Sequence, residues 1–310
     1  MVRATLAALF AVALLAAGCG GSAKQPTTTT AGHPSNSLLR GKTRLKVARI
    51  GSLPQALGKA AAHALPGGRL MVLGGYAGGR SLDTILAGVP SHLRVVGRLP
   101  QPTHDAAAAV LDGSVYLFGG GESVSTPDVV RVSPSTGSAA QAPALDEPLS
   151  DLGAVTIHGR AYLVGGYTST EFASAILRYL PHGGTATVAR LPHGTRYAGV
   201  GVLGRTIYVA GGLTTAGATR SVYAVSLGRH VRRIGTLPRP EDHAALAALG
   251  GELYLVGGRR VLAIDPASGK VSVAARLPAS LSDPTATTVG DRIVVAGGGT
   301  NGVWAVTRQK

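Results

Sequence analysis

The stretch Val115-Tyr-Leu-Phe-Gly-Gly120 decides the fold of this chain of 310 residues, because it is one of six copies of a single pattern. Each copy is a short run of aliphatic, β-branched or aromatic residues that ends in two glycines. The pairs are Gly74-Gly75, Gly119-Gly120, Gly165-Gly166, Gly211-Gly212, Gly257-Gly258 and Gly297-Gly298. They follow one another at steps of 45, 46, 46, 46 and 40 residues. Self-similarity with a period of about 40 to 50 residues is typical of propellers, in which each repeat is one blade.

A second marker, a leucine that usually precedes a proline, has the same period. The leucines are Leu53, Leu99, Leu145, Leu191, Leu237 and Leu277, and only Leu145 lacks the proline. After each marker, a stretch rich in Ala, Val and Gly predicts a first, innermost strand of small residues. A tight turn such as Asp112-Gly113 then leads into the second strand, which ends in the glycine pair. Two further strands complete each unit.

The two ends of the repeat region complement each other. The sixth unit stops twelve residues after Gly298 and lacks a fourth strand, whereas Leu45–Pro54 has the fourth-strand pattern and precedes the first unit. We expect this N-terminal segment to complete the last blade, since closure removes the unpaired edges of the sheets. The predicted fold class is all-β, a six-bladed β-propeller over residues 45–310.

The glycine pairs at this period resemble kelch repeats, and the resemblance covers essentially residues 45–310. It implies a propeller of four-stranded blades. The sequence departs from the kelch pattern near the fourth strand, where small residues such as Val231, Val271 and Ala139 replace a tryptophan; the single tryptophan is Trp304. WD-type and quinoprotein-type propellers therefore stay open as alternatives.

The N-terminal segment has the features of an export signal. Residues 1–18 carry one positive charge, Arg3, and then a small and apolar run that leads to Cys19, the only cysteine. The segment resembles a bacterial lipoprotein signal, which implies a lipid on Cys19; a simply cleaved signal is the alternative. Residues 19–44 are rich in Thr, Ser, Gly and Pro and predict a flexible tether. We expect a lipid-anchored protein on the outer face of the cytoplasmic membrane or on the cell surface.

The formal net charge of +15 raises the question of a nucleic-acid partner. The basic residues are mostly isolated arginines, and aromatic residues make up only 4% of the chain, so a base-stacking surface is not indicated. A basic exterior that faces anionic lipids and wall polymers is the simpler interpretation. We expect a monomeric domain that contacts the membrane through its lipid, binds a cell-envelope glycan or protein, and does not bind nucleic acid.

Candidate ligand-binding residues occupy equivalent positions of the repeats. Propellers usually bind ligands on the face whose loops lead into the innermost strands. The polar residues predicted there, at the mouth of the central channel, are Lys59, His104, Asp105, Asp151, Arg196, Tyr197, Asp242, His243 and Asp283. The loops after the glycine pairs add the rim residues Tyr76, Arg80, Tyr167, Arg259 and Arg260. The mouth residues differ from repeat to repeat, whereas a purely structural ring would tend to repeat itself.

These residues favour a binding module over an enzyme, and we assign no catalytic residue, metal or cofactor. A galactose-oxidase-like cofactor needs a cysteine within the propeller domain, and residues 45–310 contain none. Two enzyme alternatives stay open at the channel mouth. One is a metal site built from His104, Asp105, Asp242 and His243. The other is mutarotase-like acid–base chemistry on a carbohydrate by Asp151 or His243.

Overall fold

The computed structural model describes residues 44–228 and 230–309. The predicted export signal, the predicted lipid site at Cys19 and nearly all of the predicted tether lie outside these residues. The described residues form strands and connecting loops. Within them, no helix is long and apolar enough to cross a membrane.

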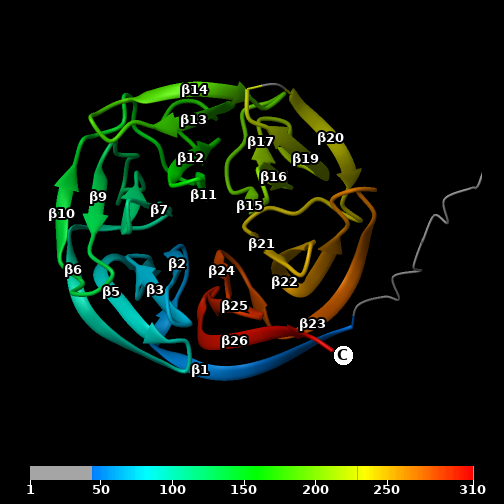
Figure 1. The fold of residues 1–310 in the computed structure, drawn as a ribbon, viewed down its shortest axis with the longest axis horizontal. Helices are drawn as coiled ribbons and strands as arrows, with labels where there is room; N and C mark the ends of the chain where they lie inside the picture. Colours follow the sequence, from blue (N-terminus) through cyan, green and yellow to red (C-terminus); the bar gives the residue numbers. More distant parts are fainter. Residues whose placement is uncertain (1–43, 229, 310) are drawn as a thin grey trace, which may run out of the picture. The chain divides into compact units, whose positions relative to one another are not determined.

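Six β-sheets are arranged around a central axis (Figure 1), which confirms the predicted fold class. Blade 1 contains β2 (Ala61–Leu65), β3 (Arg69–Leu73), β5 (Arg80–Val89) and β6 (His92–Thr103), with β4 (Tyr76–Ala77) paired to β5. Blade 2 contains β7 (Ala107–Leu111), β8 (Ser114–Phe118), β9 (Val129–Val132) and β10 (Ala139–Ala142). Blade 3 contains β11 (Gly153–Ile157), β12 (Arg160–Val164), β13 (Ala175–Tyr179) and β14 (Thr185–Arg190).

The remaining blades follow the same inside-to-outside order. Blade 4 contains β15 (Gly199–Leu203), β16 (Thr206–Ala210), β19 (Ser221–Ser226) and β20 (His230–Thr236), beside a small hairpin of β17 (Leu213–Thr214) and β18 (Gly217–Ala218). Blade 5 contains β21 (Ala245–Leu249), β22 (Glu252–Ile264) and β23 (Val271–Leu281). Blade 6 contains β24 (Pro284–Val289), β25 (Arg292–Gly297), β26 (Thr300–Arg308) and β1 (Leu45–Leu57).

The N-terminal strand closes the ring as the sequence predicts. β1 pairs antiparallel with β26, from Leu45 opposite Arg308 to Leu57 opposite Thr300. In Figure 1 this blue strand lies along the outside of the red C-terminal blade. The last blade is therefore held together by both ends of the repeat region.

Apolar clusters between neighbouring blades form the core, one at each of the six junctions. All six marker leucines are buried in these clusters, and the most exposed of them shows only 5% of its surface. Their periodic spacing in the sequence therefore reflects one packing position that recurs in every blade. Trp304 is also buried, in the cluster between blades 5 and 6.

The glycine pair is required by a close approach of two backbones. In blade 2, the Gly120 amide donates a hydrogen bond of 2.8 Å to the carbonyl of Leu149, in the segment that leads to blade 3. Gly119 has a φ of 60°, and a Cβ atom on it would collide with the same carbonyl oxygen. Only glycine supplies both the left-handed conformation and the space.

Blade 5 differs from the expected four separate strands. β22 occupies the second and the third strand positions, because its first part pairs with β21 and its second part with β23. The shorter repeat explains the difference: the step of 40 residues removes the loop that follows the glycine pair in the preceding blades. Gly257 lies between the two paired parts, and Gly258, with a φ of 53°, begins the second part opposite Leu281.

Candidate ligand site at the channel mouth

Six residues form a closed ring at one end of the central channel. They lie where the chain passes from the outer strand of one blade to the inner strand of the next, and they are Lys59, Asp105, Asp151, Tyr197, His243 and Asp283. The backbone amide of each donates a hydrogen bond to the carbonyl of its counterpart in the preceding blade, at N···O distances of 2.8 to 3.2 Å. The Lys59 amide donates to Asp283 and so closes the ring.

All six ring residues have a left-handed backbone, with φ between 51° and 57°. Glycine adopts this conformation most easily and aspartate and histidine tolerate it, whereas lysine and tyrosine rarely adopt it. None of the six is glycine. Residues with a strained backbone often cluster at functional sites. The side chains at these six positions are therefore candidates for a function.

Asp105 accepts a hydrogen bond from Lys59 and lies near His104. Lys59 Nζ lies 2.8 Å from Asp105 Oδ2, and His104 Nε2 lies 3.6 Å from the same oxygen. Burial raises the pKa of Asp105, with the charge of Lys59 acting in the opposite direction. Burial lowers the pKa of Lys59, but its hydrogen bond and ion pair with Asp105 outweigh this, so the net pKa is raised.

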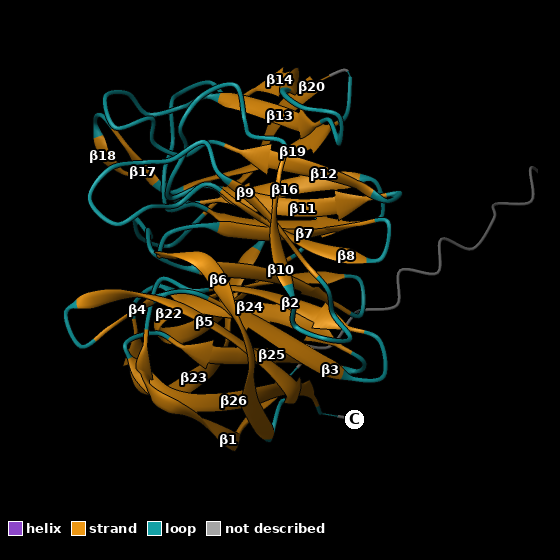
Figure 2. Cartoon of the chain, turned by 90° about the vertical axis from the view of Figure 1, so that its left-hand side faces the viewer, coloured by secondary structure: helices purple, strands orange, loops and turns teal. Residues whose placement is uncertain are grey.

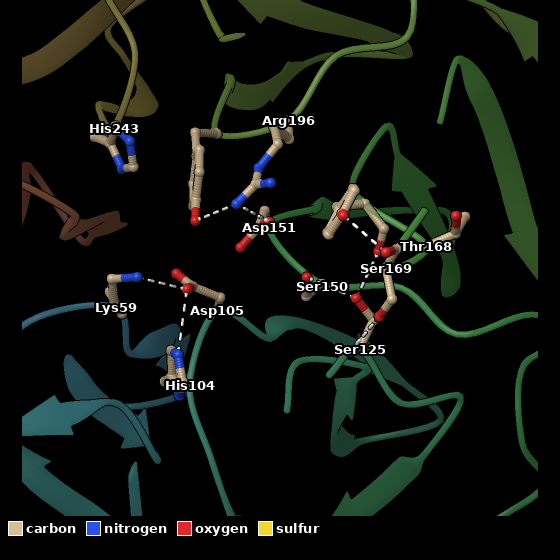
Figure 3. Close-up of polar contacts among 12 residues, drawn as sticks. Lys59, His104, Asp105, Ser125, Ser150, Asp151, Thr168, Ser169, Arg196 and His243 are labelled. Atoms are coloured by element: carbon tan, nitrogen blue, oxygen red, sulfur yellow. Dashed lines mark hydrogen bonds and ion pairs between the residues drawn. The ribbon is translucent and has the colours of Figure 1, made fainter. Parts of the chain in front are cut away.

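Asp151 pairs with Arg196 on the other side of the mouth. Its Oδ2 atom lies 2.8 Å from Arg196 Nη2, and Figure 3 shows the carboxyl group pointing toward that of Asp105. Burial, together with the negative charge of Asp105, raises the pKa of Asp151 to about 6. This carboxyl group therefore exchanges a proton near neutral pH.

The guanidinium group of Arg196 lies among three aromatic rings. Its guanidinium carbon lies 4.6 Å from the ring centre of Tyr167, 5.4 Å from that of Phe172 and 4.4 Å from that of Tyr197. Its Nη2 atom also donates a hydrogen bond of 2.6 Å to the Tyr197 hydroxyl. Burial is the main cause that raises the pKa of Tyr197 to about 12, so the phenol is neutral at physiological pH.

Tyr197 and His243 form a stacked aromatic pair, with ring centres 3.8 Å apart and planes inclined by 30°. His243 Nδ1 lies 2.5 Å from Asp283 Oδ1. This hydrogen bond is the main cause that raises the pKa of His243, against the effect of burial. His104 differs, since burial and then the charge of Lys59 lower its pKa.

Two cavities open at the mouth and share Lys59, Asp105, Asp151 and Tyr197 in their linings. The channel itself has a volume of about 180 Å³ and is lined below the ring largely by alanines of the innermost strands. The second cavity, of about 280 Å³, lies to one side, over blades 2 to 4. It adds the loop residues Glu122, Ser125, Ser150, Tyr167, Ser169 and Arg196, several of which appear in Figure 3.

The off-centre position of this cavity follows from unequal loops. In blades 1 to 4 the second and third strands are separated by longer segments, two of which contain β4 and the β17–β18 hairpin on the same side of the molecule (Figure 2). In blade 5 a single strand covers both positions, and in blade 6 only two residues separate β25 from β26. The rim is therefore built up over part of the ring.

The other predicted residues are more dispersed. Tyr76 packs on His104, with ring centres 5.1 Å apart, and Arg80 is exposed. Arg260 pairs with Glu241 rather than with a mouth residue, and exposed Arg259 donates a hydrogen bond to the Pro278 carbonyl. These four residues and Asp242 do not line the two cavities.

The structure adds residues that the sequence did not indicate. Phe172 completes the aromatic surround of Arg196, and Ser125 and Ser169 line the second cavity. They lie in loops of unequal length, where repeat alignment gives no equivalent position. Within residues 44–228 and 230–309, no group of three or more His, Cys, Asp or Glu side chains is arranged to hold a metal ion.

No protein-family model and no curated protein matches this chain. Among solved structures, it is similar to that of YjhT, with a TM-score of 0.72 and 14% sequence identity. The match covers 84% of this chain and 99% of the other. At this identity the likeness shows the fold alone, and the chain is a six-bladed β-propeller.

Proposed function

We propose that this chain is an exported, membrane-tethered binding module that takes a sugar residue of a cell-envelope glycan at the channel mouth. One observation carries the proposal. Six equivalent positions all have a left-handed backbone, and all six keep a side chain, of four different kinds, where glycine would relieve the strain. We therefore infer that the side chains at these six positions have a function of their own.

The chemistry of the mouth suits a polyol. Sugar hydroxyls both donate and accept hydrogen bonds, and the mouth offers carboxylate acceptors from Asp105 and Asp151 beside donors from Lys59 and Arg196. The stacked pair of Tyr197 and His243 adds a flat aromatic surface. Small-molecule sites usually occupy about 300 to 1,000 Å³, so cavities of about 180 and 280 Å³ fit a single sugar unit better than a long oligomer.

A protein partner at the same face is the alternative occupant. The export signal, the lipid on Cys19 and the tether over residues 19–44 belong to the proposal as sequence-based predictions. Together they would hold the propeller outside the membrane, within reach of the envelope polymers.

The proposal is tested with the chain from Gly20 onward, which contains every described strand. Calorimetric titration with wall muropeptide fragments, neutral and N-acetylated sugars and sialic acids should identify a ligand. Asp151→Asn should then abolish binding. Asp112→Asn is the matched control, because Asp112 also has a positive φ, of 45°, but is exposed at a hairpin on the opposite face. Equal affinity of both variants for the ligand would refute a site at the mouth.

A second candidate function is supported by the pKa of Asp151. A carboxyl group with a pKa of about 6 in a concave site is suited to general acid–base catalysis. Mutarotase-like opening and closing of a bound sugar ring needs such a proton donor and acceptor. Once a sugar ligand is known, exchange between its anomers is measured by NMR with and without the protein. Accelerated exchange that Asp151→Asn removes would support the enzyme, and an unchanged rate would leave the binding module.

A further inference from the structure

The outer strands of the blades are basic and contain no acidic residue. Along the six outermost strands β1, β6, β10, β14, β20 and β23 the sequence has no Asp or Glu. The same strands carry the basic residues Lys46, Arg49, Arg94, Arg98, Arg190, Arg232, Arg233 and Arg276. All fifteen acidic residues of the chain therefore lie elsewhere in the repeats.

These eight side chains face solvent, since each belongs to an exposed residue. Among them only Arg98 forms a salt bridge within the described residues, with Asp83 at 2.6 Å. The charges of the other seven residues are therefore not neutralised by a salt bridge with any described residue, in contrast to Lys59 and Arg196 at the mouth, which are both paired with carboxylates.

Seven of the eight residues lie on four consecutive blades. Going round the ring from blade 4 through blades 5 and 6 to blade 1, the outer strands are β20, β23, β1 and β6 (Figure 1). We call their basic residues the belt: Lys46, Arg49, Arg94, Arg98, Arg232, Arg233 and Arg276. β10 in blade 2 has no charged residue, and β14 in blade 3 has only Arg190.

The belt is continuous because neighbouring outer strands touch. β1 contacts both β23 and β6. Gly235 of β20 packs directly against the turn at Gly269 that precedes β23. The positive charges therefore follow a curved path around the propeller wall, at right angles to the channel.

We propose that the belt binds a flexible, linear anionic polymer that follows the wall of the propeller around these four blades. Arginine forms paired hydrogen bonds with phosphate and carboxylate oxygens, and six of the seven belt residues are arginine. The path of the belt selects among polyanions. A flat membrane reaches only one side of a curved wall, and duplex DNA, with a persistence length of about 50 nm, bends around so small a ring only at high cost.

This proposal is independent of the mouth. The belt residues lie on the outermost strands, and none of them lines either cavity at the mouth. A failure of sugar binding at the mouth would leave the belt untouched, and the reverse also holds.

The test compares two triple variants with the same net charge in the chain from Gly20 onward. The belt variant is Arg94→Gln, Arg232→Gln and Arg276→Gln, one change on each of three outer strands. The control is Arg69→Gln, Arg160→Gln and Arg205→Gln, at turns between first and second strands on the face opposite the ring. Binding to long-chain inorganic polyphosphate is measured as a function of salt concentration, with tripolyphosphate, vesicles rich in anionic lipid and duplex DNA as comparisons.

We expect the long polymer to bind most tightly, because only a long chain reaches several blades. The slope of log K against log salt is negative, and each lost contact should make it less steep by about 0.7. The slope of the belt variant should therefore be less steep than that of the wild type by about 2. If affinities converge near 1 M salt, this corresponds to a loss on the order of 100-fold at 0.1 M. The control should keep the wild-type slope.

Three results would overturn the proposal. Equal losses of polyphosphate affinity in the belt and control variants would show that binding depends only on the net charge of the protein. Tripolyphosphate binding as tightly as the long polymer would remove the need for a path around the blades. Tighter binding to vesicles or to duplex DNA would assign the belt to a flat or a stiff partner instead.

Discussion

Replacing Lys59 by glycine and by alanine measures the strain in the ring directly. Both variants lose the ion pair with Asp105, so the difference between them reports only the backbone at a φ of 55°. The left-handed conformation destabilises the folded state by about 1 to 2 kcal/mol at a residue with a Cβ atom. Glycine avoids this strain, but the larger conformational freedom that it gives the unfolded chain destabilises the folded state by about 0.4 to 1 kcal/mol. The glycine variant should therefore be more stable than the alanine variant by about 0.5 to 1 kcal/mol.

The assay is equilibrium unfolding in urea, with the free energy extrapolated at a common m-value. Ala140 provides the control, because it lies exposed in β10, where alanine is the better residue. Ala140→Gly should destabilise the protein by about 0.5 to 1 kcal/mol, the opposite order to that at residue 59. An alanine variant at position 59 as stable as the glycine variant, or more so, would refute the argument that the ring keeps its side chains against backbone strain.

Three further outcomes follow from the structure. Gly119→Ala should destabilise the protein by about 2 to 4 kcal/mol more than Gly113→Ala in urea unfolding, since both glycines have positive φ but only Gly119 packs against a carbonyl whose hydrogen bond would be lost. The pKa of Asp151 is about 6 in the folded protein and 3.8 in the unfolded chain. The contribution of this carboxyl group to the free energy of unfolding is therefore fully present below pH 3.8 and is lost as the pH rises through 6. This should lower the free energy of unfolding by about 3 kcal/mol between pH 3.5 and pH 7, and Asp151→Asn should flatten that part of the profile. Leu237→Ala, at a fully buried marker leucine, should cost about 2 to 5 kcal/mol in thermal or urea unfolding, whereas Val124→Ala, at a side chain that is 67% exposed, should stay within about 0.5 kcal/mol.

The architecture could be predicted from the sequence because each structural motif recurs in several repeats. A single glycine pair is weak evidence, but six at a nearly constant step indicate a recurring contact, and five of the six blades make it. The same reasoning placed Leu45–Pro54 in the last blade, since a missing strand at one end matched a spare strand at the other. The continuous strand β22 was not predicted, because the length of a segment does not say which hydrogen bonds its residues keep.

The candidate site could be located but not assembled from the sequence. Repeat alignment placed Asp105 and Asp151 at equivalent positions, 46 residues apart. It could not show that one carboxylate takes Lys59 as its partner and the other Arg196, because such pairing depends on rotamers and on loops of unequal length. The left-handed ring was equally hidden, since its residues lack the glycine that usually signals a positive φ.

Symmetry separates the structural from the functional features of this propeller. The backbone ring and the marker leucines recur in all six blades, and the glycine contact recurs in five of them, as the packing of similar units requires. The side chains of the ring, the loops over blades 1 to 4 and the basic outer strands do not recur in this way. Packing alone gives no reason for a ring to carry lysine in one blade and tyrosine three blades later. The positions at which the repeats share a conformation but differ in chemistry are therefore those at which substitution should alter ligand binding while leaving the fold intact.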